Sequence, residues 1–92
     1  MKKLSDAEIF DLTNTHQDWI FHGFSLEKKF KFVNFFEALS FVVKVGMLAE
    51  KVEHHPDICL FSYNQVSIKT CTHQVGGLTM KDIELIIQID NI

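Results

Sequence analysis

The stretch Glu50-Lys51-Val52-Glu53-His54-His55-Pro56 decides how the chain folds, because it closes the longest helical pattern and turns the chain back toward a sheet. Pro56 fixes its own φ and biases His55 toward an extended backbone, so a helix that reaches Glu50 or Val52 should stop here. The two imidazoles then lie at the helix exit and should point in different directions. Because imidazole titrates near neutrality, such a group suggests acid/base chemistry.

Upstream of this stretch lies the strongest helical pattern of the chain. Asn34 with Glu37 three residues later is a helix-start signal. A broad apolar stripe follows it: Phe35, Phe36, Leu39, Val42, Val43, Met47 and Leu48. The pattern predicts one long helix over residues 35–52, mostly in the core, although Gly46 lowers its helix propensity by about 1 kcal/mol relative to Ala.

Two hairpins and two shorter helices complete the predicted order. Alternating side chains predict strands over residues 18–24 and 26–33, and again over 58–63 and 66–73 around an Asn64-Gln65 turn. The pattern from Ser5 to Glu8 and the pattern from Thr79 to Asp82 predict helices over about residues 6–13 and 80–89. The order αββαββα predicts an α+β fold with a four-stranded antiparallel sheet and helices packed on one face.

Composition limits the class of protein. A length of 92 residues predicts a single domain spanning 1–92, and a hydrophobic fraction of 47% with nine Phe exceeds what so small a core can hide, so self-association is expected. A net charge of -3 argues against direct nucleic-acid binding. Glu37 and Lys44 interrupt the richest apolar run, so no membrane span is expected.

The N-terminal residues and the two cysteines indicate the cellular compartment. The first residues show no signal-peptide pattern, which favours a cytoplasmic protein. Cys59 and Cys71 are then expected to be free thiols, and a disulfide between them across the second hairpin is the alternative.

The densest polar group of the sequence consists of Glu50, His54, His55, His73 and Asp82. Topology should return His73 and Asp82 to the sheet end where the long helix delivers the histidine pair. Zinc is not favoured, because adjacent histidines rarely reach one ion and no paired ligand spacing is present. Nucleophilic catalysis is weaker still, because neither cysteine has an activated setting and no serine elbow occurs. The alternative is that the histidines are surface or packing residues, as we expect for His16 and His22.

The spacing of these residues resembles the signature of the pterin-4a-carbinolamine dehydratases. Glu50 is followed after three residues by His54-His55-Pro56, after six more by Tyr63, after nine by His73 and after eight by Asp82. Further agreement lies in Trp19, Phe30-Lys31-Phe32, Tyr63-Asn64-Gln65-Val66, Thr72-His73 and Gly76-Gly77-Leu78-Thr79. Gln74, where an acidic residue is common, and Gly46, where Ala is frequent, depart from the pattern.

The resemblance implies an enzyme of tetrahydrobiopterin metabolism. Such an enzyme dehydrates 4a-hydroxytetrahydropterin to quinonoid dihydropterin and so recycles the pterin of an aromatic amino-acid hydroxylase. The pterin is the substrate, and neither a metal nor a bound cofactor is implied. Homodimers or homotetramers are implied for the assembly. The alternative is a non-catalytic interaction module, since some relatives serve as dimerisation cofactors of a homeodomain transcription factor and others as assembly factors.

The resemblance also implies roles for individual residues. His54 and His73 resemble the acid/base pair of the family, and His55 resembles the histidine that holds the substrate and its hydroxyl. Glu50 and Asp82 would orient the imidazoles. Among substrate-binding positions, Trp19 would offer a flat apolar wall, whereas Pro56 and Tyr63 would mainly support the pocket.

Overall fold

The computed structural model describes residues 1–92, and its elements follow the predicted order αββαββα with one additional short 3-10 helix. The elements are α1 (Asp6–Thr15), β1 (Ile20–Phe21), β2 (Leu26–Lys31), α2 (Phe35–Val52), β3 (Asp57–Phe61), β4 (Gln65–Thr70), η1 (His73–Val75) and α3 (Met80–Asp90). The predicted α+β class is therefore confirmed. No helix combines the length and the apolar character that crossing a bilayer requires.

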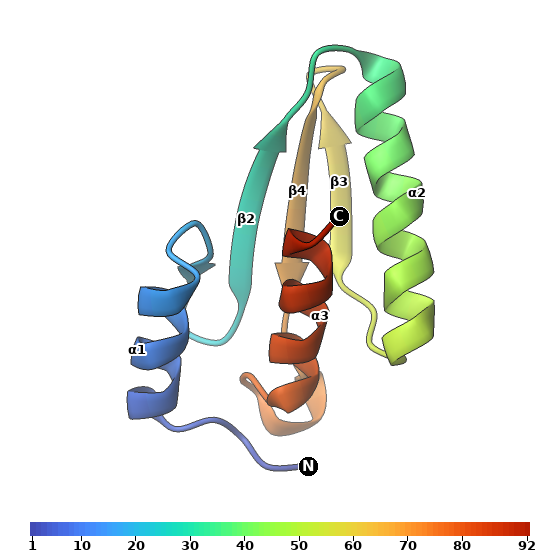
Figure 1. Ribbon diagram of the computed structural model, residues 1–92. Helices are drawn as coiled ribbons and strands as arrows, with labels where there is room; N and C mark the ends of the chain where they lie inside the picture. The colour runs from blue at the N-terminus through green and yellow to red at the C-terminus, as the bar shows by residue number, and fades with distance from the viewer.

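The two hairpins join into a single antiparallel sheet with the strand order β1-β2-β4-β3. β2 pairs with β4 from Leu26 opposite Thr70 to Lys31 opposite Gln65, and β3 pairs along the other side of β4. In Figure 1, α2 runs along the β3 side of the sheet, and α3 lies in front of β4. The helices therefore cover one face of the sheet, as predicted.

Strand alternation sorts the side chains between the two faces. Val66 and Ile68 of β4 are fully buried beneath the helices, whereas the intervening Ser67 is only half-buried on the opposite face. The helices contribute the remaining buried apolar side chains, such as Val45 of α2 and Leu85 of α3. One apolar core thus lies between the sheet and its helices.

The first predicted strand is much shorter than expected. β1 has only two residues, Ile20 and Phe21, instead of seven over residues 18–24. Trp19 turns into the core, where it is 1% exposed and its indole N–H donates to the Asp90 carboxylate at 3.0 Å. The alternation read as a long strand therefore reflects burial of an aromatic residue under the end of α3.

The second hairpin also differs in detail. Its loop spans residues 62–64, and Ser62 and Tyr63 occupy the left-handed region with φ of 48° and 57°. Asn64 is buried, and its side-chain amide donates to the carbonyl of Phe32 at 2.9 Å. This contact ties the hairpin tip to the end of β2, which explains why Asn64 belongs to the loop and Gln65 to β4.

Candidate acid/base site

Helix α2 ends at Val52 as predicted, but Glu53 makes the stop three residues before Pro56. Glu53 adopts the left-handed conformation with φ 57° and ψ 43°. Its N–H donates to the Glu50 carbonyl at 3.3 Å, and the N–H of His54 donates to the Ala49 carbonyl at 3.1 Å. This pair of bonds is a Schellman motif, which reverses the chain direction and delivers His54 toward α3.

Asp82 is the centre of the buried part of the site. It lies in the first turn of α3 and is 0% exposed. Its Oδ1 lies 2.6 Å from His54 Nε2 and accepts from the Thr70 hydroxyl at 2.6 Å. Its Oδ2 accepts from the Thr72 hydroxyl at 2.7 Å and from the Thr79 N–H at 2.9 Å. All four acceptor positions of the carboxylate are therefore used within the protein.

This network assigns a tautomer to His54. Since Asp82 accepts from every neighbour, the hydrogen on the neutral imidazole belongs on Nε2, and Nδ1 keeps a free lone pair. Nδ1 has no partner in the protein, and no buried side-chain nitrogen or oxygen lacks a partner. Nδ1 therefore reaches solvent, although the His54 side chain as a whole is only 13% exposed. The free nitrogen is placed to exchange a proton with a bound molecule.

His55 points away from this network, as the sequence predicts. Its Nε2 contacts the Glu50 carboxylate, and both side chains are mostly exposed, at 67% and 77%. The two adjacent imidazoles are thus oriented by two different carboxylates, one buried and one at the surface. Pro56 lies half-buried between His55 and the start of β3.

His73 lies beyond the end of β4 and not within it, because β4 ends at Thr70 and His73 begins η1. Its ring contacts Cys71, with Nε2 3.7 Å from the sulfur. Burial raises the pKa of the Cys71 thiol, and the carboxylates of Asp82 and Asp57 raise it further. Cys71 is therefore a protonated thiol at neutral pH, beside an exposed imidazole.

Two predicted pocket residues do not join the histidines within one chain. The buried Trp19 has no open ring face, so the expected flat wall is not available in this structure. Tyr63 is 64% exposed at the tip of the second hairpin, at the opposite end of β3 from His55 (Figure 1). The packing of the single Trp against Asp90 and Phe30 accounts for the first difference.

Several residues of the site were missed by the sequence analysis. The capping pattern identified Thr79 and Asp82 as a pair, and both the capping box and its bonds are present. Thr70, Thr72 and Lys81 gave no local signal, because their partners lie 12, 10 and 29 residues away in sequence. Cys71 and Cys59 are free thiols, and Cys59 pairs with Ser67 across the hairpin. No group of three His, Cys, Asp or Glu side chains is placed to hold a metal ion.

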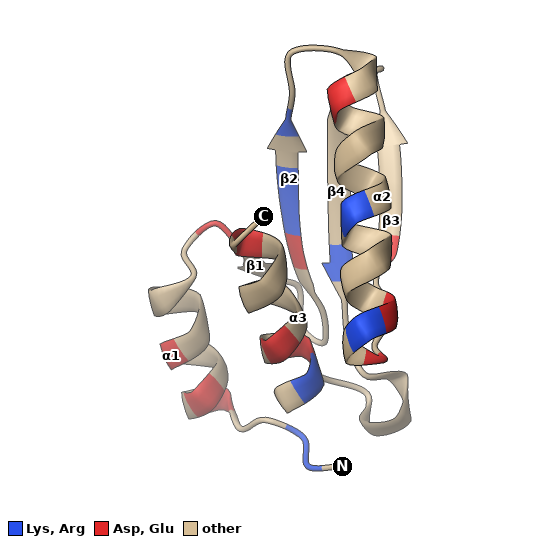
Figure 2. Cartoon of the chain, turned by 45° about the vertical axis from the view of Figure 1, so that its right-hand side comes forward, with Lys and Arg blue, Asp and Glu red and all other residues tan.

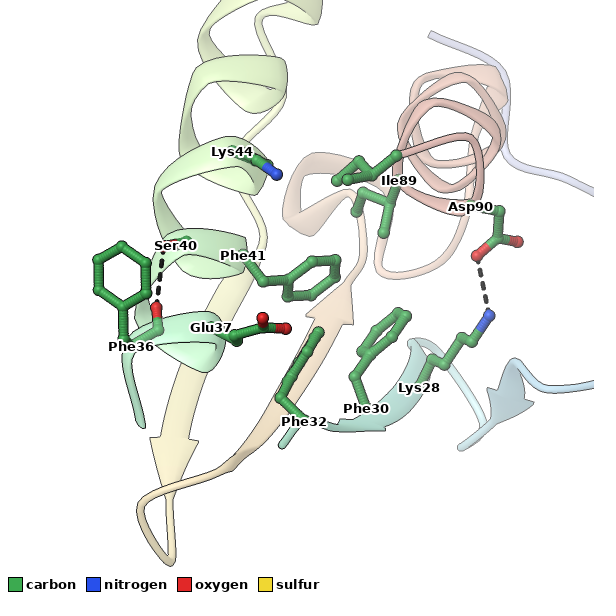
Figure 3. Close-up of a pocket in the computed structure, with 11 residues that line it drawn as sticks. Lys28, Phe30, Phe32, Phe36, Glu37, Ser40, Phe41, Lys44, Ile89 and Asp90 are labelled. Atoms are coloured by element: carbon green, nitrogen blue, oxygen red, sulfur yellow. Dashed lines mark hydrogen bonds and ion pairs between the residues drawn. The ribbon is translucent and has the colours of Figure 1, made fainter. Parts of the chain in front are cut away.

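A separate hollow of about 460 Å³ lies among β2, α2 and the end of α3 (Figure 3). Phe41 forms its centre, with ring centroids 4.6 Å from Phe30 and 5.0 Å from Phe32. Figure 3 shows the charged ends of Glu37 and Lys44 on its α2 side. The side chains of the acid/base site do not line this hollow, so the polar site and the aromatic hollow are distinct features.

A buried carboxylate that orients an imidazole, with two more histidines on the adjoining segments, defines a candidate acid/base site on an α+β domain. The family model described as pterin 4 alpha carbinolamine dehydratase matches residues 2–92. The chain belongs to the pterin-4a-carbinolamine dehydratase family.

Individual relatives agree with this assignment. The chain is 41% identical over 92 residues to a protein of Sulfurisphaera tokodaii provisionally named pterin-4-alpha-carbinolamine dehydratase, covering 100% of this chain and 98% of that protein. It is 42% identical over 90 residues to a protein of Roseiflexus sp. with the same provisional name, covering 98% and 96%.

Solved structures share the fold. A crystal structure described as a transcriptional coactivator/pterin dehydratase from Brucella melitensis superposes with a TM-score of 0.89 at 27% identity, covering 98% of this chain and 97% of that chain. A pterin dehydratase-like protein described as a RuBisCO assembly factor in the alpha-carboxysome gives a TM-score of 0.67 at 22% identity, covering 83% and 89%. The second likeness concerns the fold alone.

Proposed function

We propose that this protein dehydrates 4a-hydroxytetrahydropterin to quinonoid dihydropterin and water, with histidines as the acid and the base. The observation that carries the proposal is the His54 ring, fixed by the buried Asp82 at 2.6 Å and left with a free Nδ1. Membership in the family supplies the substrate class.

The reaction requires two proton movements. The bond between C4a and its hydroxyl oxygen breaks, and the oxygen takes a proton and leaves as water. N5 loses its proton, and the electron pair of that N–H bond forms the new double bond between N5 and C4a. The acid therefore delivers one proton and the base removes one. The site returns to its starting state once the proton on the base is transferred to the acid, directly or through water. Groups that titrate near neutral pH suit both steps.

We assign the base to His54. Its Nδ1 would accept the N5 proton, and the resulting imidazolium would be stabilised by Asp82 through the Nε2 hydrogen. Because the hydroxyls of Thr70 and Thr72 and the Thr79 N–H all donate to Asp82, the carboxylate is held in place before the proton moves. The reorganisation that accompanies proton transfer is thereby kept small.

His73 would serve as the acid at the departing hydroxyl, and His55 would hold the substrate and its hydroxyl with the support of Glu50. Both rings are exposed and accessible to a ligand from solvent. The protonated Cys71 beside His73 can donate to the neighbouring ring nitrogen, but it supplies no nucleophile. The pterin is the substrate in this scheme, and recycling it for an aromatic amino-acid hydroxylase would be the physiological role.

A second candidate function is that of a protein-interaction module. It is favoured by α2, which exposes a stripe of apolar side chains on the face turned away from the core: Phe36, Leu39, Val43 and Met47. Figure 2 shows the charged residues of this helix near its two ends and at one place between them. A helix that is apolar on both faces is expected to be buried on both.

We propose that a second copy of the chain covers this stripe. In an antiparallel pair of α2 helices that crosses at Val43, near the middle of α2, Leu39 of one copy would face Met47 of the other, so the stripe is complementary to itself. Val43→Glu should then lower the molar mass seen by light scattering to that of one chain. An unchanged mass would reject this interface.

The function is tested by generating the carbinolamine in situ with a hydroxylase and following its decay with and without the protein. Acceleration by the folded protein supports the dehydratase. A decay rate equal to the uncatalysed rate, with the fold intact by circular dichroism, would reject it in favour of the interaction module.

A further inference from the structure

We propose that Lys81 is a positioning residue for His54, a role that rests on the proposed function of His54 in proton transfer. Lys81 and Asp82 are neighbours in the first turn of α3. The Lys81 ammonium donates to the Val52 carbonyl at 3.0 Å, and Asp82 accepts from His54 at 2.6 Å. Two adjacent residues of α3 therefore contact Val52 and His54, the residues on either side of Glu53 at the C-terminal end of α2. We call this segment, residues 52–54, the α2 exit.

The place of Lys81 in α3 is not explained by α3 itself. A cation in the first turn of a helix is disfavoured by the partial positive charge of the helix N-terminus. Lys81 is nevertheless half-buried, and its ammonium lies on the last carbonyl of α2, where a cation is favoured. The position of Lys81 is therefore explained by its contact with the C-terminal end of α2.

The α2 exit needs such a contact. The Schellman motif pairs the carbonyls of Ala49 and Glu50, and Val52 accepts no bond from it. Glu53 adopts a left-handed conformation that a residue with a side chain adopts at a cost, so the reversal tends to relax unless it is held. Lys81 supplies the missing donor at the residue before Glu53.

Release of this contact should displace His54 and not Asp82. Asp82 is fixed independently by Thr70, Thr72 and the Thr79 N–H. The His54 side chain, by contrast, makes a single hydrogen bond, to Asp82, and its backbone directly follows the end of α2. Movement of the exit therefore changes the imidazole position relative to the reacting atoms, while the buried carboxylate stays in place.

Lys51 provides a matched control. It lies in the last turn of α2, carries the same charge and is exposed, and its side chain makes no hydrogen bond or ion pair. Loss of its charge removes a cation from the same end of α2, but it leaves the Val52 contact intact. The pair Lys81→Met and Lys51→Met thus separates positioning from long-range electrostatics.

The experiment measures kcat and KM of both variants in the carbinolamine assay, together with the 15N-imidazole NMR spectrum of His54 in each folded protein. For Lys81→Met we expect kcat to fall by about tenfold with KM within about twofold, as for a misplaced proton-transfer group. Its His54 Nε2 hydrogen should exchange faster with water. Lys51→Met should match wild type in both measurements, and Lys81→Arg should recover most of kcat because it restores the donor.

The proposal is overturned if Lys81→Met equals Lys51→Met in kcat or in the His54 ring spectrum. If Lys81→Met does not fold, Lys81→Gln, which shortens the side chain and removes the charge, carries the same comparison. If wild type itself proves inactive, the proposed function fails, but the ring spectrum still decides whether Lys81 positions His54.

Discussion

His54 Nε2 lies 2.6 Å from Asp82 Oδ1, which joins the exit of α2 to the first turn of α3 across 28 residues of sequence. The carboxylate is fully buried, and the other three bonds to it come from the hydroxyls of Thr70 and Thr72 and from the Thr79 N–H. The same interaction therefore contributes to folding and to the orientation of a reactive ring.

Asp82→Asn should damage both stability and activity. The amide nitrogen would face two donors in place of a carboxylate oxygen, and we expect the free energy of unfolding to fall by about 3 kcal/mol because buried donors lose their acceptor. The His54 tautomer would no longer be fixed, so kcat should fall by about 10²-fold. Urea denaturation and the carbinolamine assay check the two effects.

Glu50→Gln is the matched comparison, because Glu50 also contacts a site histidine but is mostly exposed. Exposed pairs contribute little, so the free energy of unfolding should change by less than about 0.5 kcal/mol. If Asp82→Asn lowered the free energy of unfolding no more than Glu50→Gln does, the buried hydrogen bonds of Asp82 would not stabilise the fold as proposed.

Glu53→Gly should stabilise the protein. Glu53 has a φ of 57°, which costs an L-residue with a side chain about 1–2 kcal/mol, whereas glycine adopts it freely. Part of this gain is offset by the larger entropy of glycine in the unfolded chain, so a net gain of about 0.5 kcal/mol is expected. Thermal unfolding measures it. Glu53→Ala removes the same side-chain atoms beyond Cβ and keeps the strain, so a Tm rise in Glu53→Ala that matches the rise in Glu53→Gly would contradict this explanation.

The pH dependence of stability should reveal the Glu27 contact. The Ser67 hydroxyl donates to Glu27 at 2.7 Å and is the main cause that holds the pKa of this carboxyl below its ordinary value of 4.5; Lys69 and His22 lower it further, against partial burial. A lowered folded-state pKa adds stability that is present above pH 4.5 and is lost as the pH falls through the folded-state pKa.

Ser67→Ala should therefore destabilise the protein by about 1 kcal/mol at neutral pH, and the difference from wild type should shrink in acid. Urea denaturation at about pH 7 and about pH 3 makes the comparison. Ser40→Ala is the control, because the Ser40 hydroxyl donates to the Phe36 carbonyl and to no titratable group. A Ser67→Ala difference that persists in acid as the Ser40→Ala difference does would contradict this role of Glu27.

The order of helices and strands could be predicted because its signals are local. The capping boxes at Ser5 and Thr79 both form. Helix α2 ends at Val52, as the stretch from Glu50 to Pro56 predicts. The strand lengths could not be predicted, because Trp19 is buried in the core and its indole N–H donates to Asp90, 71 residues away. Alternation alone does not distinguish an aromatic residue in a strand from one buried beneath a helix.

The site was partly predictable for the same reason. The histidines and Asp82 stand out as residue types, but the threonines that surround Asp82 are ordinary β-strand and capping residues until the fold brings them together. Cys71 was predicted only as a free thiol, and its contact with His73 is what places it beside the histidines. Long-range hydrogen bonds of this kind leave no periodic or spacing signal.

Chemical labelling should distinguish the two cysteines. Cys59 is exposed on the edge strand β3, whereas burial and two nearby carboxylates raise the pKa of the Cys71 thiol. Because the thiolate is the reactive form, iodoacetamide at mildly alkaline pH should modify Cys59 first. Mass spectrometry of partially labelled protein checks the order, and Cys59→Ser should leave only the slow site. Faster modification of Cys71 would contradict the protonated thiol inferred beside His73.

The central claim is that His54 and His73 move protons in the dehydration of 4a-hydroxytetrahydropterin. The most direct test compares the dehydration rates of wild type, His54→Ala, His73→Ala and His16→Ala, the last removing a histidine that pairs with Asp90 away from the site. We expect the first two variants to lose about 10² to 10⁴ in rate while they stay folded, and His16→Ala to retain wild-type turnover. Near-wild-type turnover in His54→Ala and His73→Ala would contradict the account.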